Sequence, residues 1–305
     1  MTAPLKLGIV GFGKIARDEH VPAIARTGGL SLAAVASHHG QAEGVPNYPS
    51  LTDMLAAHPE LDAVILCQPP AARFAAAKEA LSAGKHVFLE KPPGTSISEL
   101  SLLRDLAGRT GVTLFAAWHS RHAPQVAELK HWCAGRKLLR VTIEWREDVR
   151  LWHPGQDWIW QPGGFGVMDP GINALSILTE VVPEPIRLVA ARLEVPANRA
   201  TPIGAELSME TASGAPVSAV FDWRETGPQT WRILFEAEDG RFDFGQGQSP
   251  DPEGETAISS EYGALYRRFA ELIRDRRSEV DAAPLQLVAD AFLAGRIDIV
   301  RPFDQ

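Results

Sequence analysis

The sequence predicts an α/β protein with an N-terminal Rossmann domain, built on a doubly wound parallel sheet, and a C-terminal α/β domain with a large, open, mixed and mainly antiparallel sheet. Three observations support this fold class. Short apolar runs alternate with helical stretches in the first part of the chain, a glycine-rich loop follows the first run, and longer alternating segments joined by short turns come later. We place the boundary between residues 1–121 and 122–305.

The apolar runs of the first domain are expected to be strands, and Ala/Leu-rich stretches between them to be helices. The expected strands are Leu5–Val10, Leu32–Ala36, Ala63–Cys67, His86–Leu89 and Thr113–Ala117. Two of the expected helices are Ala71–Ser82 and Ser96–Ala107. Strands and helices that alternate at this spacing predict a parallel sheet with helices on both faces, and right-handed crossovers are then expected.

The second domain is expected to begin with a helix and then to build its sheet from longer strands. A helix over Pro124–Ala134 precedes a strand over Leu138–Trp145, a Gly/Pro/Trp-rich loop over 147–166 and a helix that starts near Asp169. The further strands are Ile186–Val195, Ala205–Thr211, Pro216–Trp223, Trp231–Glu236 and Arg241–Phe244. A surface loop is expected over Gln248–Glu255, and helices over Tyr262–Arg276 and Leu285–Ala294. This C-terminal helical region could pack back on the first domain.

The composition and net charge exclude several classes of binding partner. The 305 residues include 30 Lys and Arg against 38 Asp and Glu, a net charge of -8, which disfavours nucleic acid and anionic membranes. The N-terminus resembles no signal peptide, and two isolated cysteines form no disulfide framework or zinc spacing. We therefore expect a cytoplasmic protein. His119 and His122 lack a third ligand at a persuasive spacing, so no metal is expected.

The glycine-rich loop predicts a dinucleotide site. Gly11-Phe12-Gly13-Lys14-Ile15-Ala16 follows an expected strand and opens an expected helix, as the G-x-G-x-x-G/A pattern requires. Gly11 permits the tight turn, Gly13 lets the backbone approach a pyrophosphate, and Lys14 and Ile15 begin the helix whose N–H groups meet it. The alternative is a glycine-rich turn without a ligand.

The end of the second expected strand favours NADP over NAD. An acidic residue usually binds the ribose 2′-hydroxyl of NAD at this place, but here Ser37 and His38 stand there, and Glu43 is the first carboxylate. Ser37 and His38 can donate hydrogen bonds to a 2′-phosphate. Because no arginine accompanies them, NAD is expected to be tolerated.

Glu90-Lys91-Pro92 ends the fourth expected strand at the carboxyl edge of the sheet, where ligands bind in open α/β folds. Pro92 disfavours a helical conformation at Lys91. A lysine held there could neutralise a developing alkoxide. The alternative is a solvated lysine at a strand end.

These motifs, with Asp169-x-Gly171-x-Asn173, resemble the Gfo/Idh/MocA oxidoreductase family over the whole chain. The resemblance implies that Glu90 and Lys91 lie near the nicotinamide, that Lys91 also meets substrate, and that Pro92 is often cis. A closer likeness is to the aldose 1-dehydrogenases that act on D-galactose and L-arabinose. It is carried by four segments: Trp118–Arg121, Trp145–Asp148, Trp152–Trp160 and Asp169–Asn173.

Asp169 and Asn173 are the expected substrate-side pair. By itself, Asp169-Pro170 is typical of a helix start with an N-cap acid, and this remains the alternative interpretation. Relatives often carry His or Tyr where Asn173 stands, and asparagine cannot titrate. We therefore expect Asp169 to be the general base and Asn173 to orient the hydroxyl, with Lys91 as the competing base. The reaction implied is hydride loss from the anomeric carbon, which gives an aldonolactone.

The tryptophan-rich region predicts a sugar site. The chain has eight tryptophans, and an indole can cover the apolar face of a sugar while its N–H reaches a hydroxyl. Hydroxyls could also be read by histidine and glutamate side chains. The expected substrate residues are Lys91, His119, Glu147, Trp152, His153, Asp169, Asn173 and Trp231. The alternative for the aromatic residues is a packed loop or a subunit contact.

Two other functions stay open. One is a related inositol-type polyol or dihydrodiol dehydrogenase, and the other is a cofactor-binding regulator that has lost catalysis. The presence of both Lys91 and Asp169 argues against the regulator. Because the open sheet needs a cover, and the family commonly dimerises through that face, we expect a homodimer.

Overall fold

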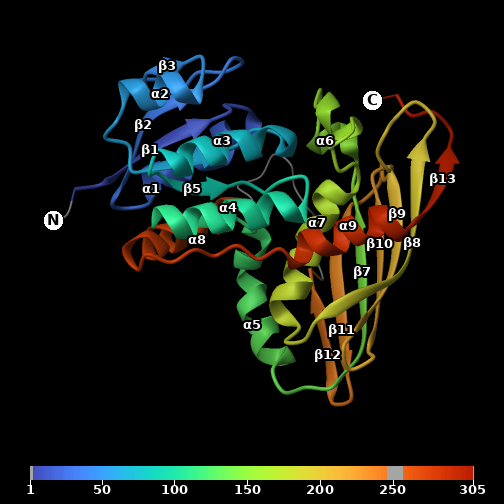
Figure 1. Ribbon diagram of the computed structural model, residues 1–305. Helices are drawn as coiled ribbons and strands as arrows, with labels where there is room; N and C mark the ends of the chain where they lie inside the picture. Colours follow the sequence, from blue (N-terminus) through green and yellow to red (C-terminus); the bar gives the residue numbers. More distant parts are fainter. Residues whose placement is uncertain (1–2, 246–256, 305) are drawn as a thin grey trace. The chain divides into compact units, whose positions relative to one another are not determined.

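The computed structural model describes residues 3–245 and 257–304, so the loop expected over Gln248–Glu255 lies outside the described residues. The chain forms two compact units (Figure 1). One comprises Met1–His122 with Ala257–Ala282, and the other comprises Ala123–Thr256 with Ala283–Gln305. The chain therefore returns to the first unit after most of the second is complete.

The first unit contains a six-stranded sheet in which every pair of neighbours is parallel. In spatial order the strands are β3 (Asn47–Tyr48), β2 (Leu30–Ala36), β1 (Leu5–Val10), β4 (Ala63–Leu66), β5 (His86–Leu89) and β6 (Leu114–Ala116). The order reverses at β1 and β4, as in a doubly wound fold. The predicted parallel Rossmann sheet is confirmed, and β3 is a short strand that the sequence pattern did not indicate.

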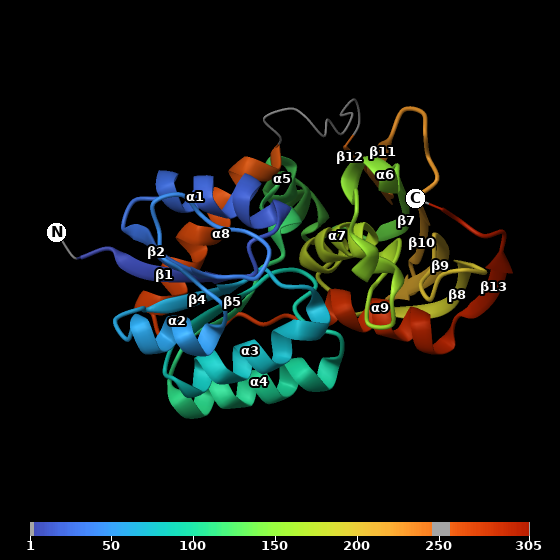
Figure 2. The same cartoon turned by 90° about the horizontal axis from the view of Figure 1, so that it is seen from above.

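Helices cover both faces of this sheet (Figure 2). α2 (Leu51–Ala57), α3 (Pro70–Ser82) and α4 (Ile97–Thr110) lie on one face, and α1 (Val21–Arg26) and α8 (Ala257–Arg274) on the other. α8 is amphipathic and buries Tyr262, Leu265, Tyr266, Phe269 and Leu272 in the core of the unit. The helix from the far end of the chain thus completes the first unit.

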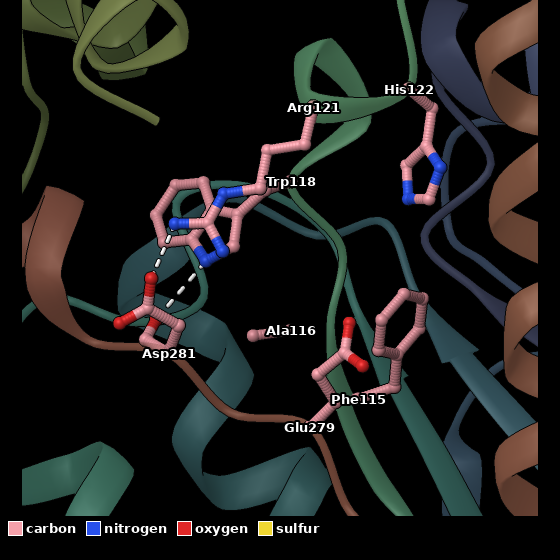
Figure 3. A pocket seen from close by; sticks show the side chains of 7 residues that line it. All are labelled: Phe115, Ala116, Trp118, Arg121, His122, Glu279 and Asp281. Carbon is pink, nitrogen blue, oxygen red and sulfur yellow. Dashed lines mark hydrogen bonds and ion pairs between the residues drawn. The ribbon is translucent and has the colours of Figure 1, made fainter. Parts of the chain in front are cut away.

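The segment after α8 is fastened to the edge of the sheet at β6. Glu279 pairs with Phe115, and its backbone N–H donates to Leu114 O at 3.0 Å. Figure 3 shows the hollow beside this contact, where the Trp118 indole donates to Asp281 O at 3.0 Å. The Arg121 guanidinium binds the Asp281 carboxylate. These bonds hold the returning chain in place.

The second unit contains a seven-stranded mixed sheet. In spatial order the strands are β12 (Gly240–Phe244), β11 (Thr230–Ala237), β7 (Leu138–Arg146), β10 (Pro216–Asp222), β9 (Gly204–Thr211), β8 (Ile186–Pro196) and β13 (Arg296–Val300). β7–β10 and β8–β13 are parallel pairs, and the other neighbours are antiparallel. The predicted mixed, mainly antiparallel sheet is confirmed, although β13 was not expected.

Helices α7 (Met168–Val181) and α9 (Ala283–Ala294) pack on the sheet of the second unit, and α5 (Pro124–Cys133) packs on α7. Along β7, Val141, Ile143 and Trp145 are buried, whereas Thr142 and Glu144 are half-buried, as the alternating pattern predicts. The expected loop over 147–166 contains two short helices, α6 (Val149–Trp152) and the 3₁₀ helix η3 (Asp157–Trp160). Asp148 begins α6 by accepting the Arg150 N–H at 2.9 Å.

Candidate active site

The glycine-rich loop has the geometry of a phosphate cradle. Gly11 has φ +84°, and a Cβ there would lie 2.9 Å from Gln68 N, so the position requires glycine. A Cβ on Gly13 would meet nothing within 4 Å, which leaves open space beside the backbone. The helix that begins at Lys14 directs its first N–H groups toward that side. These residues fit a pyrophosphate, and the sequence identified both glycines.

The end of β2 holds the same loop. Gly11 N donates to Ala36 O at 2.9 Å, and Phe12 N donates to the Ser37 hydroxyl oxygen at 3.2 Å. Ser37 therefore has its oxygen engaged as an acceptor and keeps a hydroxyl hydrogen to donate. His38 is exposed, and Lys14 forms an exposed ion pair with Asp18 at 2.5 Å. Ile15 is 36% exposed although it is apolar. The predicted cofactor contacts of these residues stay predictions.

The segment Glu90-Lys91-Pro92 follows β5 directly, and its Lys91–Pro92 peptide bond is cis. Arg73 of α3 is buried and donates to the backbone O of Glu90 at 2.6 Å and to that of Pro92. One guanidinium thus holds the carbonyls on both sides of Lys91. No feature of the sequence indicates this role for Arg73, which occurs in an alanine-rich helix.

A buried network of hydrogen bonds surrounds the Glu90 side chain. One carboxylate oxygen accepts the Tyr262 hydroxyl at 2.5 Å and His20 Nε2 at 2.9 Å, and the other accepts the Lys91 backbone N–H at 2.8 Å. The opposite ring nitrogen of His20, Nδ1, lies 2.6 Å from the Tyr266 hydroxyl. Glu90 is 3% exposed and His20 is 0% exposed. The sequence marked Glu90 but missed His20, Tyr262 and Tyr266.

The pKa values of the network favour the ionised pair. Burial alone would raise the pKa of Glu90, but the hydrogen bond and charge of His20, with His119 and Tyr262, outweigh burial and lower the pKa to about 2. Burial alone would lower the pKa of His20, but Cys67 and the Glu90 carboxylate raise that pKa to about 10. At neutral pH the pair is therefore imidazolium and carboxylate.

His119 belongs to the same region of the first unit. Its Nδ1 lies 2.7 Å from the Glu261 carboxylate, and its ring stacks on Tyr262 with centroids 5.6 Å apart. Because a carboxylate only accepts, Nδ1 carries the hydrogen, and a neutral His119 keeps Nε2 as an acceptor. The predicted role in binding substrate thus gains an orienting partner, Glu261. The prediction did not include Glu261, which lies beside Tyr262 on α8.

In the second unit, Asp169 lies in the first turn of α7 and is 3% exposed. The alternative interpretation, in which Asp169 is the N-cap, is wrong, because Val167 occupies that position and no side chain caps the helix. The helical turn starts earlier, since Asp169 N already donates to Gly166 O at 2.9 Å. His153 Nε2 lies 3.7 Å from Asp169 Oδ2, so the structure brings these two predicted substrate residues together.

Two buried polar atoms of the second unit have no hydrogen-bond partner among the described residues. They are Asn173 Oδ1, an acceptor, and Trp145 Nε1, a donor. Leaving such atoms buried and unpaired costs roughly 1–3 kcal/mol each. Asn173 follows Asp169 by four residues on α7, so both share one side of the helix. An acceptor and a donor of this kind suit hydroxyl groups, which both donate and accept.

Indole rings surround the buried carboxylate of Glu147. Trp223 Nε1 and Trp231 Nε1 donate to its two oxygens at 3.0 and 2.9 Å. The Trp231 ring stacks on that of Trp145, with centroids 5.2 Å apart, and contacts that of Trp152, with centroids 5.0 Å apart. Glu147 is 2% exposed, so this buried carboxylate orients the indoles of Trp223 and Trp231 through its two hydrogen bonds. The predicted residues Glu147, Trp152 and Trp231 thus form one cluster, whereas Trp223 was missed as a member.

Two absences concern only the described residues. Over 3–245 and 257–304 the structure places no group of three or more His, Cys, Asp or Glu side chains where they could hold a metal ion. In the same ranges there is no helix that is both long and apolar enough to cross a membrane.

Comparisons with known proteins agree over the whole chain. The model of an oxidoreductase family with an NAD-binding Rossmann fold matches residues 5–118. The chain is 42% identical over 308 residues to galactose 1-dehydrogenase from Pseudomonas fluorescens, covering 99% of each protein. The crystal structure of D-galactose-1-dehydrogenase from Rhizobium etli matches with 49% identity and a TM-score of 0.91, over 100% of this chain and 99% of that one.

A more distant structure shares the fold alone. GenD2 from gentamicin A biosynthesis, in complex with NAD, matches at 19% identity with a TM-score of 0.84. The match covers 96% of this chain and 95% of GenD2. The two-unit architecture is therefore common to proteins that differ widely in sequence.

Proposed function

The chain belongs to the Gfo/Idh/MocA oxidoreductase family and is an NAD(P)-dependent sugar dehydrogenase, and we propose that it oxidises the anomeric carbon of D-galactose and L-arabinose to the aldonolactone. The full-length similarity to two galactose 1-dehydrogenases supports the sugar and the position oxidised. L-Arabinose has the ring configuration of D-galactose without the exocyclic hydroxymethyl. One carbon group changes binding by only about 1–3 kcal/mol, so one site can accept both.

The observation that carries the proposal is the unsatisfied polar atom of Asn173 beside the buried carboxylate of Asp169. A hydroxyl that donates to Asn173 Oδ1 would satisfy an acceptor that has no hydrogen-bond partner among the described residues, and the buried Asp169 carboxylate can accept from a hydroxyl as well. The cluster of Trp145, Trp152 and Trp231 supplies apolar ring faces of the sort that sugars stack on. Polar groups and rings together suit a small polyhydroxylated ring.

We assign the proton transfer to Asp169. The anomeric hydroxyl must lose its proton as the hydride leaves, and a buried carboxylate held beside His153 is suited to accept it. Asn173 orients the hydroxyl without titrating. Lys91 is the competing base, and in our proposal it stabilises negative charge that develops on the oxygen. The nicotinamide, when bound, supplies the hydride acceptor.

NADP is the proposed cofactor, with NAD accepted as well. The loop around Gly11 and Gly13 fits the pyrophosphate that both cofactors share. No carboxylate stands at Ser37 or His38 to repel a 2′-phosphate, and both side chains can donate to one. The absence of an arginine there argues for a modest preference. Lys14, Ile15, Glu90 and Lys91 remain proposed cofactor contacts.

We further propose a cytoplasmic homodimer. The cysteines Cys67 and Cys133 are both free, which suits a reducing compartment. The face of the second sheet that carries Thr142 and Glu144 has half-buried and exposed side chains, among them the exposed Ser208 and Ser218, and a second copy of the chain would cover it. Light scattering of the purified protein measures the assembly.

The test is the initial rate of NADP and NAD reduction, followed by nicotinamide absorbance. The substrates are D-galactose, L-arabinose, D-xylose, D-glucose and myo-inositol. We expect fast reduction with D-galactose and L-arabinose, and a higher kcat/KM with NADP than with NAD. Turnover of myo-inositol but of no aldose would replace the proposal with a polyol dehydrogenase. Cofactor binding without any turnover would indicate a regulator.

A further inference from the structure

The buried network around Glu90 is more elaborate than the stability of the first unit requires. An ion pair of a His and a Glu, both almost wholly buried, must offset the loss of hydration on each partner. Apolar side chains of similar volume often stabilise a core equally well. Here both ring nitrogens of His20 and both oxygens of Glu90 have partners. A complete polar network of this kind specifies one geometry.

The geometry that it specifies is that of the backbone at Lys91. Glu90 Oε2 accepts the Lys91 N–H at 2.8 Å, while Tyr262 and His20 fix the other oxygen of the same carboxylate. Arg73 holds the flanking carbonyls of Glu90 and Pro92. Neither the N–H of Lys91 nor the carbonyls on either side of this residue can therefore turn without breaking a buried bond.

The network also connects this segment to the glycine-rich loop. His20 is the last residue of the π-helical stretch η1 (Ala16–His20), and the helix containing η1 begins at Lys14, directly after Gly13. π-Helical turns are rare and occur frequently at functional sites. One helix therefore carries, at its start, the N–H groups proposed to bind phosphate and, six residues after Lys14, the partner of Glu90.

We propose that Tyr262 and His20 are positioning residues, which fix the Glu90 carboxylate and through it the placement of Lys91 relative to the glycine-rich loop. The inference rests on the proposed function, in which Lys91 acts during hydride transfer. Tyr262 is the sharper probe of the two, because its hydroxyl donates directly to Glu90 while its ring packs on His20 and His119. Tyr262→Phe removes the hydrogen bond and keeps the ring.

The chain offers a matched control in Tyr48→Phe. Tyr48 lies in the same unit, and its hydroxyl is 2.9 Å from His58 Nε2, outside the network. We expect Tyr262→Phe to lower kcat about tenfold, as for loss of a bond to a charged group, with KM for NADP within about twofold of wild type. We expect Tyr48→Phe to stay within about twofold in both constants. A kcat that falls equally in the two variants, or in neither, overturns the proposal.

A second measurement does not depend on sugar turnover or on a variant that folds poorly. Nitrogen-15 spectra of histidine-labelled wild-type protein report the protonation of His20, which Glu90, Tyr262, Tyr266 and Cys67 face. An imidazolium signal at a pH of about 8 supports the network, because an ordinary histidine is neutral there. A neutral ring at that pH overturns it. If the wild type oxidises no sugar, the proposed function fails, and the spectra still decide whether the charged network exists.

Discussion

The two units hold their candidate residues by opposite means. In the first unit, the segment around Lys91 is fixed by buried charges whose polar atoms are hydrogen-bonded to one another: Glu90 with His20 and Tyr262, and Arg73 with two carbonyls. In the second unit, indole rings build the surroundings, and buried polar atoms of Asn173 and Trp145 lack partners among the described residues.

The difference suggests what each unit is for. A dinucleotide presents the same atoms in every turnover, so a region that binds it can be fixed completely in advance. A region that receives a sugar needs hydrogen-bonding groups that the sugar itself completes, and apolar faces that define its ring. The surroundings of Lys91 are therefore hydrogen-bonded in advance, whereas Asn173 and Trp145 offer polar atoms that a substrate would satisfy. The contrast concerns these two places and not whole units, because Asn47 Oδ1 and Gln68 Oε1 of the first unit also lack partners among the described residues.

The largest fall in kcat is expected at Asp169, the residue of the second unit to which we assign the proton transfer. Asp169→Asn removes the proposed base with little change in size, and we expect kcat to fall on the order of a thousandfold while NADP binding is retained. Glu180→Gln is the control, since it makes the same exchange of acid for amide on the same helix, at a half-buried position away from Asp169. Steady-state kinetics with D-galactose and fluorescence titration of NADPH measure the two quantities.

A small loss in Asp169→Asn would contradict the assignment. Lys91→Met would then be expected to abolish turnover, and the proton acceptor would belong to the first unit.

A second prediction sharpens the comparison by making one exchange in each unit. Glu147→Gln leaves one of the Trp223 and Trp231 N–H groups without an acceptor, so we expect KM for the sugar to rise roughly tenfold and KM for NADP to stay unchanged. Glu90→Gln should instead lower kcat, because it disturbs Lys91, while sugar KM changes little. Steady-state kinetics of both variants measure kcat and the KM values for sugar and NADP. If the two variants change the same constants, the distinction between the units is wrong.

The sequence predicted much of the fold because local signals and fold-level rules agreed. The run from Leu5 to Val10, the glycines at 11 and 13 and the strand at His86–Leu89 are read correctly from apolar patterning and turn chemistry. Strand β13 was missed, because it is only five residues long and its Ile297 and Ile299 are exposed at the sheet edge rather than buried in an apolar run. The predicted helix start near Asp169 agrees with α7, which begins at Met168, but the N-cap alternative for Asp169 fails because the backbone turns earlier.

The parts of the site that depend on distant segments could not be predicted in this way. His20 and Glu90 are 70 residues apart, and Tyr262 is a further 172 residues from Glu90. No local pattern pairs them, because only the return of α8 to the first unit brings Tyr262 to that place. Glu147 was predicted as a site residue, which stays a prediction, but its two indole partners come from β11 and from Trp223, just after β10. Sequence motifs predict candidate site residues, but the contacts that these residues make depend on tertiary packing.

The smallest predicted effect concerns stability and tests whether charge holds the first unit together. The pKa of His20 is raised to about 10 from an ordinary value of 6.5, so the native state keeps a proton that the unfolded chain releases between those values. The stabilisation is complete below pH 6.5 and is lost as the pH rises toward 10. Glu90, with a pKa lowered to about 2, is ionised in both states over this interval and adds no slope.

Relative to His20→Gln, the unfolding free energy of the wild type should therefore decrease by roughly 1 kcal/mol per pH unit above pH 7. Urea unfolding of both proteins between about pH 6 and pH 9 measures the difference, where the buried tyrosines do not yet titrate. Parallel curves would mean that His20 is neutral in the native state, and the segment around Lys91 would then be fixed by hydrogen bonds without an ion pair between His20 and Glu90.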